Sequence, residues 1–267
     1  MISCSISKVI HNERLRHGFH LLRLEAPAIA EDAVPGQFVM LKGHVPSWPY
    51  LRRPFSVYSS DGEACIDIVY KVVGRATEIM SHMNGGDSFD VIGPLGNAFA
   101  VKEGVSHAVA VAGGIGIPPV GFYCQRYVSV FDRMILIVGA KVREELLVPV
   151  GFVVEGVELV IYTEDGSKGA KGTACDGLRK TLDSLGAGRE SVQVVACGPN
   201  GMLYGVHRIC EERGITCEVS VEEIMACGVG ACLACAVPHA GGGYLHACKE
   251  GPVLDSASID WERWLRK

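Results

Sequence analysis

The sequence lacks the features that place a protein in a membrane. Residues 105–125 contain no Asp, Glu, Lys or Arg, but glycines and prolines interrupt the middle of this stretch. It therefore reads as strand, loop and helix rather than as a membrane span. No positively charged and then apolar leader opens the chain, so we expect a cytoplasmic protein that does not enter a membrane.

A large excess of charge of one sign is also missing. The 267 residues carry 25 Lys and Arg against 30 Asp and Glu, a formal net charge of −5. Without a basic excess, nothing points to a nucleic-acid partner. The length allows two domains and a small appendage.

Evenly paired cysteines, as in a disulfide framework, are absent too. The chain has eleven cysteines, an odd number. Seven have no paired spacing, and we expect them to be small buried side chains in a reducing compartment. These are Cys4, Cys65, Cys124, Cys175, Cys197, Cys210 and Cys217.

The other four cysteines follow the spacing Cys-x4-Cys-x2-Cys-x12-Cys. They are Cys227, Cys232, Cys235 and Cys248. Three ligands from one glycine-containing loop and a distant fourth match the plant-type ferredoxin pattern, so we predict a [2Fe-2S] cluster. A structural zinc site is the alternative, although zinc ribbons usually present two separated Cys-x2-Cys pairs.

Residues 1–100 contain short apolar runs separated by Gly, Pro, Asn and Asp. This pattern predicts an antiparallel β-barrel with one short helix at residues 76–81. The expected strands cover residues 6–10, 20–24, 37–41, 53–59, 64–72 and 88–91.

Two segments of this predicted barrel carry side chains suited to cofactor binding. One strand contains Arg53, Pro54, Phe55 and Ser56, which is weak evidence when taken alone. A second strand with Val69, Tyr70 and Lys71 runs into Gly74 and a helix start at Ala76 and Thr77. Free backbone amides and a hydroxyl at such a start can receive a phosphate.

The first segment resembles the flavin-binding R-x-[YF]-[ST] strand of the ferredoxin-NADP reductase superfamily. The resemblance implies that Arg53 contacts the FAD pyrophosphate and that Ser56 lies near the reactive ring nitrogen. Val69, Tyr70 and Lys71 then line the cofactor, and the helix start holds its phosphate. Many relatives have Gly-Thr where this chain has Ala76 and Thr77. Residues 93–99 resemble the segment that ends the barrel in this superfamily, although a plain Gly-Pro turn fits equally well.

Residues 101–219 alternate between β-branched runs and helical stretches, which predicts a doubly wound parallel sheet. The expected strands are residues 107–112, 134–138, 157–162, 192–196 and 217–219, and the expected helices are 118–128, 143–147, 174–185 and 200–213. Ligands bind at the carboxyl ends of such strands.

Two of these strand ends look chemical. Gly113, Gly114 and Gly116 link the first strand to its helix and can cradle a pyrophosphate, although the full G-x-G-x-x-G fingerprint is missing. Cys197, Gly198 and Pro199 end the fourth strand; the superfamily resemblance implies that they position the nicotinamide, without a nucleophilic role for Cys197.

Glu164 and Asp165 follow the third strand. These acidic residues favour binding of NAD over NADP, although an ordinary Asp-Gly turn is the alternative.

Over nearly its whole length the chain resembles the electron-transfer subunits of NAD-dependent (class 1B) dihydroorotate dehydrogenase. The resemblance implies an FAD barrel (1–100), an NAD domain (101–219) and a [2Fe-2S] module (220–267). It also implies an FMN-containing catalytic partner that oxidises dihydroorotate in pyrimidine biosynthesis, in a heterotetramer of two of each subunit. No catalytic acid or base is predicted in this chain. A hydrogenase or ferredoxin-linked reductase subunit and, more remotely, a zinc-binding adaptor remain alternatives.

Overall fold

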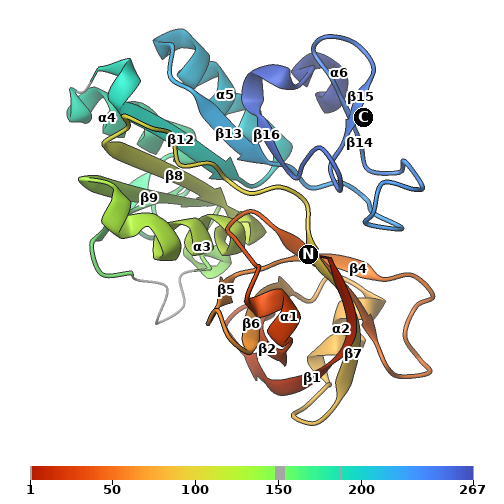
Figure 1. Cartoon of the computed structure of the whole chain (residues 1–267). Helices are drawn as coiled ribbons and strands as arrows, with labels where there is room; N and C mark the ends of the chain where they lie inside the picture. Colours follow the sequence, from red (N-terminus) through yellow and green to blue (C-terminus); the bar gives the residue numbers. More distant parts are fainter. Residues whose placement is uncertain (1, 148–153, 187, 267) are drawn as a thin grey trace.

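The N-terminal part of the chain forms an antiparallel sheet of seven strands (Figure 1). The computed structural model describes residues 2–147, 154–186 and 188–266. The strand order is β4-β3-β7-β1-β2-β6-β5. The strands are β1 (Ser3–Arg14), β2 (Phe19–Glu25), β3 (Phe38–Gly43), β4 (Arg53–Ser56), β5 (Ser59–Ser60), β6 (Cys65–Lys71) and β7 (Ser88–Leu95).

One continuous segment closes this sheet into a barrel. β4 pairs with β3, and only two residues later β5 pairs with β6 at the other end of the strand order. Alternate residues point inward, as the period of two requires. In β6, for example, Ile66 and Ile68 have no exposed surface.

Two short helices accompany the barrel, where the sequence pattern predicted one. The predicted helix is α2 (Arg75–Ser81). The additional helix, α1 (Pro27–Ala30), has only four residues and begins with a proline, so it is too short to produce a periodic pattern.

The second sheet has the order β11-β10-β9-β8-β12-β13-β16 and confirms the doubly wound prediction. All pairs are parallel except β13 with β16. Its strands are β8 (His107–Gly113), β9 (Arg133–Ala140), β10 (Val157–Thr163), β11 (Ala170–Lys171), β12 (Val192–Cys197), β13 (Cys217–Ser220) and β16 (Val253–Asp255).

Helices cover both faces of this sheet, because its strands are apolar on both sides. In β8, Ala108, Ala110 and Ala112 belong to the core under α3 (Ile117–Tyr127). Val109 and Val111 belong to the opposite core, under α4 (Ala174–Leu185) and α5 (Asn200–Arg213). The helix expected at residues 143–147 is only a 3-10 turn, Arg143–Glu145, since the stretch is too short for a stable α-helix.

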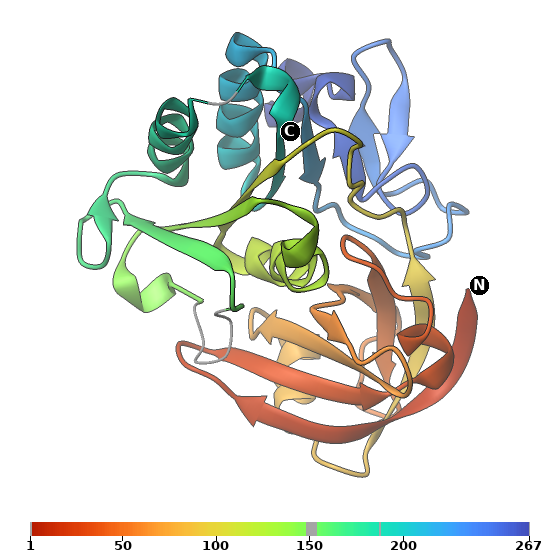
Figure 2. The same ribbon diagram turned by 60° about the vertical axis from the view of Figure 1, so that its left-hand side comes forward.

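The C-terminal residues form a small module against both sheets (Figures 1 and 2). It contains the cysteine loop, the hairpin of β14 (Ala236–Pro238) with β15 (Tyr244–His246), and α6 (Trp261–Leu265). Its strand β16 joins the second sheet. Asn97, just after β7, donates to the carbonyl oxygens of Glu250 and Val253, each at 2.8 Å. The end of the barrel is therefore fastened to this module.

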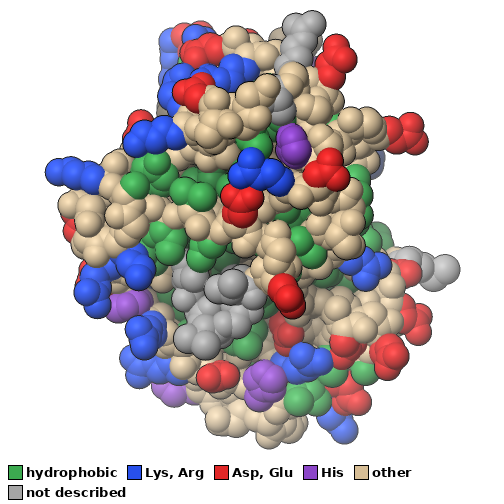
Figure 3. All heavy atoms as spheres, turned by 90° about the vertical axis from the view of Figure 1, so that its left-hand side faces the viewer, with side chains coloured by type: hydrophobic (Ala, Val, Ile, Leu, Met, Phe, Trp, Pro, Cys, Tyr) green, Lys and Arg blue, Asp and Glu red, His purple; other side chains and the backbone are tan. Residues whose placement is uncertain are grey.

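The surface agrees with the balanced composition. On the face drawn in Figure 3, Lys and Arg side chains are interspersed with Asp and Glu. Within the described residues, every helix is too short or too polar to span a bilayer.

Candidate functional site

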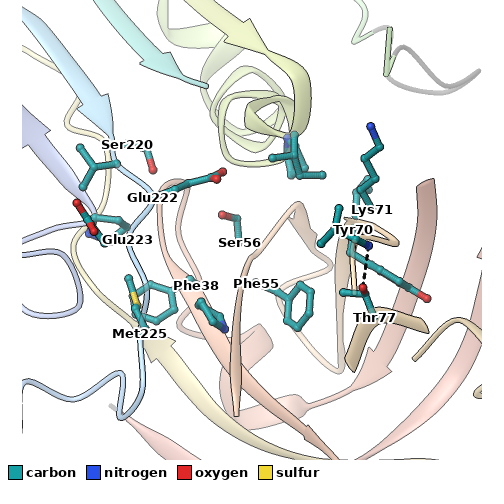
Figure 4. A pocket seen from close by; sticks show the side chains of 17 residues that line it. Phe38, Phe55, Ser56, Tyr70, Lys71, Thr77, Ser220, Glu222, Glu223 and Met225 are labelled. Carbon is teal, nitrogen blue, oxygen red and sulfur yellow. Dashed lines mark hydrogen bonds between the residues drawn. The ribbon is translucent and has the colours of Figure 1, made fainter. Parts of the chain in front are cut away.

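A cavity of about 310 Å³ lies where the barrel, the second sheet and the C-terminal module meet (Figure 4). The barrel contributes β4 and β6, the second sheet contributes the start of α3, and the module contributes residues after β13. The lining residues are Phe38, Pro54, Phe55, Ser56, Val69, Tyr70, Lys71, Val73, Thr77, Ile115, Pro118, Ser220, Val221, Glu222, Glu223, Met225 and Pro252. This mixture of apolar walls and a few polar groups is typical of a site for a flat organic cofactor.

The wall of the cavity that the barrel provides contains aromatic side chains, and contacts with neighbouring residues fix their positions. The rings of Phe55 and Tyr70 meet edge to face at 6.1 Å, and Tyr70 stacks on His20 at 5.2 Å. The Tyr70 hydroxyl donates a hydrogen bond to Asn12 Oδ1 at 3.0 Å. Burial raises the pKa of Tyr70 to about 12, so its hydroxyl stays protonated.

Three of the predicted flavin-binding residues do not line this cavity. Arg53 donates to the carbonyl oxygens of Leu51 and Arg52, and among the described residues it has no carboxylate partner. Its charge is thus available to an anion. The other two, Gly74 and Ala76, lie at the start of α2.

The Thr77 hydroxyl already has protein partners. It accepts from the backbone N–H groups of Val73 and Gly74 and donates to the Gly74 carbonyl. The side chain therefore shapes the loop beside the cavity, a use that the sequence pattern did not predict.

The two predicted loops of the second sheet touch each other. A Cβ atom on Gly116 would lie 2.1 Å from the Cys197 carbonyl oxygen, and one on Gly113 would lie 3.1 Å from Pro199 Cδ. Only glycine permits this approach of Gly116 to the β12 end. The two strand ends are therefore packed directly against each other.

Cys197 is buried at this point, and burial raises the pKa of its thiol well above the ordinary value. It stays a neutral thiol beside the Ser220 hydroxyl. This environment does not activate a nucleophile.

The acidic loop after β10 forms a turn that is stabilised by hydrogen bonds within the loop. Asp165 accepts hydrogen bonds from the Ser167 hydroxyl and backbone N–H, and these lower the pKa of the Asp165 carboxyl. Ser167 in turn accepts from the Arg143 N–H, which ties the loop to the end of β9. Glu164 is exposed beside this turn.

The four predicted ligand cysteines come together in the C-terminal module. Cys235 and Cys248 have their sulfurs 3.3 Å apart, and the Cys232 thiol lies within hydrogen-bonding reach of Cys227. Backbone N–H groups approach three of the sulfurs: Val229 and Cys232 donate to Cys227, Gly230 to Cys248 and Cys248 to Cys235.

These backbone contacts stabilise negative charge on sulfur. Burial opposes ionisation of Cys227, but the N–H groups of Val229 and Cys232 outweigh it and lower the pKa to about 6. Burial and the neighbouring Cys235 thiol raise the pKa of Cys248 to about 12. An acceptor-rich thiolate set with amide donors suits an iron–sulfur cluster.

The four thiols lie as two pairs, Cys227 with Cys232 and Cys235 with Cys248. Two pairs of thiols fit two irons with two ligands each. A structural zinc ion needs four ligands around one point.

Sequence reasoning missed the segment from Ser220 to Met225, which lines the cavity. It follows the carboxyl end of β13, where ligands bind in such sheets, and that position was the available signal. Glu223 accepts a hydrogen bond from Trp264 Nε1. Glu222 lines the cavity and keeps exposed surface, and desolvation by the surrounding protein raises the pKa of its carboxyl.

Comparison with known proteins gives one consistent family. Residues 222–260 match the family described as the iron–sulfur cluster binding domain of dihydroorotate dehydrogenase B. The chain is 36% identical, over 91% of its length and 93% of the relative, to dihydroorotate dehydrogenase B (NAD(+)), electron transfer subunit, of Desulforamulus reducens. It is 35% identical to the same subunit of Clostridium acetobutylicum, over 94% of each chain.

Solved structures agree on the fold. One, described as an NADH-dependent reduced ferredoxin-NADP oxidoreductase, has a TM-score of 0.84 and 27% identity, and covers 99% of this chain and 93% of its own. A ferredoxin NADP+ reductase from Neisseria gonorrhoeae with bound FAD and NADP has a TM-score of 0.66 at 17% identity, covering 79% of this chain and 92% of its own. The predicted barrel, doubly wound sheet and cluster module are thereby confirmed.

Proposed function

Because the chain belongs to the family of dihydroorotate dehydrogenase B electron transfer subunits, we propose that it carries electrons from dihydroorotate oxidation to NAD. In this proposal a partner subunit oxidises dihydroorotate on FMN. The electrons then pass through the [2Fe-2S] cluster and FAD of this chain. The chain itself contributes no dihydroorotate site.

One observation carries the proposal: the same short segment of chain lines the cavity and begins the cysteine loop. Met225 lines the cavity, and Cys227 follows two residues later. In addition, Gly228 lies against Met40 of β3, and Met40 pairs with Pro54 in the cavity wall. A cluster on these thiols is thus adjacent to a cofactor in the cavity.

The site residues divide among three groups in this proposal. Arg53 binds the FAD pyrophosphate, and Ser56 approaches the reactive ring. The rest of the FAD site is Pro54, Phe55, Val69, Tyr70, Lys71, Gly74, Ala76 and Thr77. The nicotinamide nucleotide lies over Gly113, Gly114, Gly116, Cys197, Gly198 and Pro199, and the cluster ligands are Cys227, Cys232, Cys235 and Cys248. Residues 1–100, 101–219 and 220–267 form the corresponding three parts.

FAD supplies the conversion between single electrons and a hydride. The protein's own residues supply placement. Phe55 and Tyr70 hold the ring against one wall, and the contact between Gly116 and Cys197 leaves a flat surface for the nicotinamide. The backbone N–H groups around Cys227 and Cys248 stabilise the charge of the thiolates.

We further propose a heterotetramer of two electron-transfer and two catalytic subunits in the cytoplasm. The seven cysteines outside the proposed ligand set form no disulfide, which suits a reducing compartment. The partner's FMN provides the first two-electron acceptor.

The test is to express this chain alone and together with the catalytic subunit that a neighbouring gene encodes. The complex should contain FAD, FMN, iron and acid-labile sulfide, and it should reduce NAD with dihydroorotate. The chain alone should be coloured and should pass electrons from NADH to a dye. A complex that holds all the cofactors but gives no dihydroorotate-dependent NADH would overturn the proposal.

A second candidate is a reductase subunit of a ferredoxin-linked complex, favoured by the 0.84 TM-score to the ferredoxin-NADP oxidoreductase. The same experiment separates the two. Under this alternative the chain copurifies with a different partner, and reduced ferredoxin rather than dihydroorotate drives NAD reduction.

A further inference from the structure

The strand β1 departs from regular alternation near its end, and this departure directs one polar side chain at the barrel interior. Ser7 and Val9 are buried at every second position, so a regular strand would next place His11 inward. Instead the register with β2 shifts between Val9 and His11, so that Ile10 is an extra residue and His11 is exposed. Bulges of this kind re-aim side chains, and here the inward position passes to Asn12.

Asn12 connects two parts of the barrel domain that lie far from it in the sequence. Its Nδ2 donates to the backbone carbonyl oxygens of Met80 at 2.7 Å and Met83 at 2.9 Å. Its Oδ1 accepts the hydrogen bond from the Tyr70 hydroxyl at 3.0 Å. Both N–H donors and the carbonyl oxygen of the side-chain amide are therefore engaged.

One of these parts is the aromatic wall of the cavity. Tyr70 lines the cavity beside Phe55 (Figure 4), contacts the rings of Phe55 and His20, and has only 1% of its surface exposed. Contacts between rings are weakly directional, whereas the hydrogen bond from the hydroxyl prefers a narrow range of distance and angle. Asn12 therefore fixes where the Tyr70 ring lies along the wall.

The other part is the end of α2. Met80 lies in the last turn of this helix, and Met83 lies two residues beyond its end. Carbonyl groups in the last turn have few partners within a helix, and Asn12 supplies donors to them. At the start of the same helix, the Thr77 hydroxyl accepts from the N–H of Val73, a residue that lines the cavity. The helix is thus held at both ends.

We propose that Asn12 is a positioning residue of the FAD site. This inference rests on the FAD site of the proposed function. Asn12 holds the Tyr70 ring and α2 in one arrangement, so the aromatic wall and the loop before α2 keep their relative positions. Asn12 itself is not among the described residues that line the cavity, so its effect on the cofactor passes through these neighbours. Loss of its amide should loosen FAD without removing a residue from the cavity wall.

The test uses the full chain with its bound cofactors and compares the parent with Asn12→Ala. The matched control is Asn84→Ala, because Asn84 is exposed and also donates to a backbone carbonyl just beyond α2, that of His82, at 2.8 Å. The dissociation constant of FAD is measured by ultrafiltration. Asn12→Ala should bind FAD about 10-fold more weakly than the parent, whereas Asn84→Ala should resemble the parent.

A double-mutant cycle with Tyr70→Phe separates positioning from a general loss of stability. Tyr70→Phe removes the hydroxyl that Asn12 binds and should weaken FAD binding about 3-fold by itself. Because both changes remove the same hydrogen bond, the effects of Asn12→Ala and Tyr70→Phe should be less than multiplicative in the double variant.

The fluorescence lifetime of bound FAD gives an independent readout, since a tyrosine ring in contact with a flavin quenches the flavin fluorescence. The lifetime should lengthen in Asn12→Ala, where the Tyr70 ring is no longer fixed, and should stay unchanged in Asn84→Ala. In the Tyr70→Phe background, Asn12→Ala should not lengthen it further.

If Asn12→Ala does not fold, Asn12→Asp replaces it. The aspartate keeps the shape of the side chain and an acceptor for Tyr70, but it cannot donate to the carbonyl oxygens of Met80 and Met83, so it should also loosen FAD. Parent-like FAD binding in the Asn12 variant, equal weakening in Asn84→Ala, or fully multiplicative effects of Asn12→Ala and Tyr70→Phe would overturn the proposal. Failure of dihydroorotate turnover with FAD still bound would affect only the proposed function, because none of these measurements uses the partner subunit.

Discussion

The contact between the cysteine loop and the barrel should control how firmly the cluster is held. Gly228 has φ +74°, and a Cβ atom there would lie 2.5 Å from Met40 Cγ. Gly230 has a similar φ of +80°, but its Cβ would lie 3.2 Å from Cδ of the flexible Lys249 side chain. Gly228→Ala and Gly230→Ala therefore share a backbone penalty and differ in the steric one.

The magnitudes follow from these two terms. A left-handed conformation costs an alanine about 1–2 kcal/mol in either variant. Overpacking against Met40, which has no exposed surface, adds about 1–3 kcal/mol to Gly228→Ala alone. If opening of the loop precedes cluster loss, Gly228→Ala should lose its cluster to a chelator about 5- to 150-fold faster than Gly230→Ala.

The assay follows the visible absorption of the cluster after a chelator is added, in variants shown to hold FAD. Met40→Ala provides the decisive background, since it removes the obstructing side chain. In that background Gly228→Ala and Gly230→Ala should lose iron at similar rates, which is a double-mutant coupling between Gly228 and Met40. Equal rates in the parent background, or an undiminished difference with Met40→Ala, would refute the packing argument.

Three further predictions address the cofactor sites. Arg53→Ala should release FAD during dialysis because a charged contact to the pyrophosphate is lost, whereas Arg52→Ala, whose side chain pairs with Asp90, should keep it; equal retention would remove Arg53 from the site. Cys232→Ala should lose iron and partner-coupled electron flow but keep NADH-to-dye reduction, with Cys4→Ser as an unchanged control; partner-coupled turnover without a cluster would contradict the route. NADH should reduce the flavin much faster than NADPH, and Glu164→Ala should narrow the difference; stopped-flow rates that are equal for both would count against the acidic loop.

The sequence predicted those parts of the molecule that depend on local periodicity. β8, α4 and α5 lie where the alternation of runs placed them, because each carries its own repeat of buried residues. The cysteine spacing was also informative because it is local: Cys227, Cys232 and Cys235 lie within nine residues of one another. The short elements were not predicted correctly. The helix α1 and the turn at Arg143–Glu145 have too few residues for a periodic pattern of buried residues.

The cavity could not be predicted in the same way, because its walls come from three distant parts of the chain. The pairing of β16 with β13 joins residues that no short-range pattern connects. Glu222 and Met225 therefore read as an unremarkable stretch before the cysteines. Only the three-dimensional structure shows that β13 ends at the cavity, so that these two residues line it.

One backbone hydrogen bond and the side chain of Asn97 tie the C-terminal module together and to the barrel. On one side, Val221 donates to the Pro252 carbonyl, which joins the segment before the cysteine loop to the segment after Cys248. On the other, Asn97 accepts from the Val253 N–H at 3.0 Å and donates to the Glu250 carbonyl. Asn97 lies two residues after the end of β7, so these bonds join the segment after Cys248 to the barrel. These hydrogen bonds thus hold together the end of the barrel, the segment that lines the cavity and the segment after Cys248.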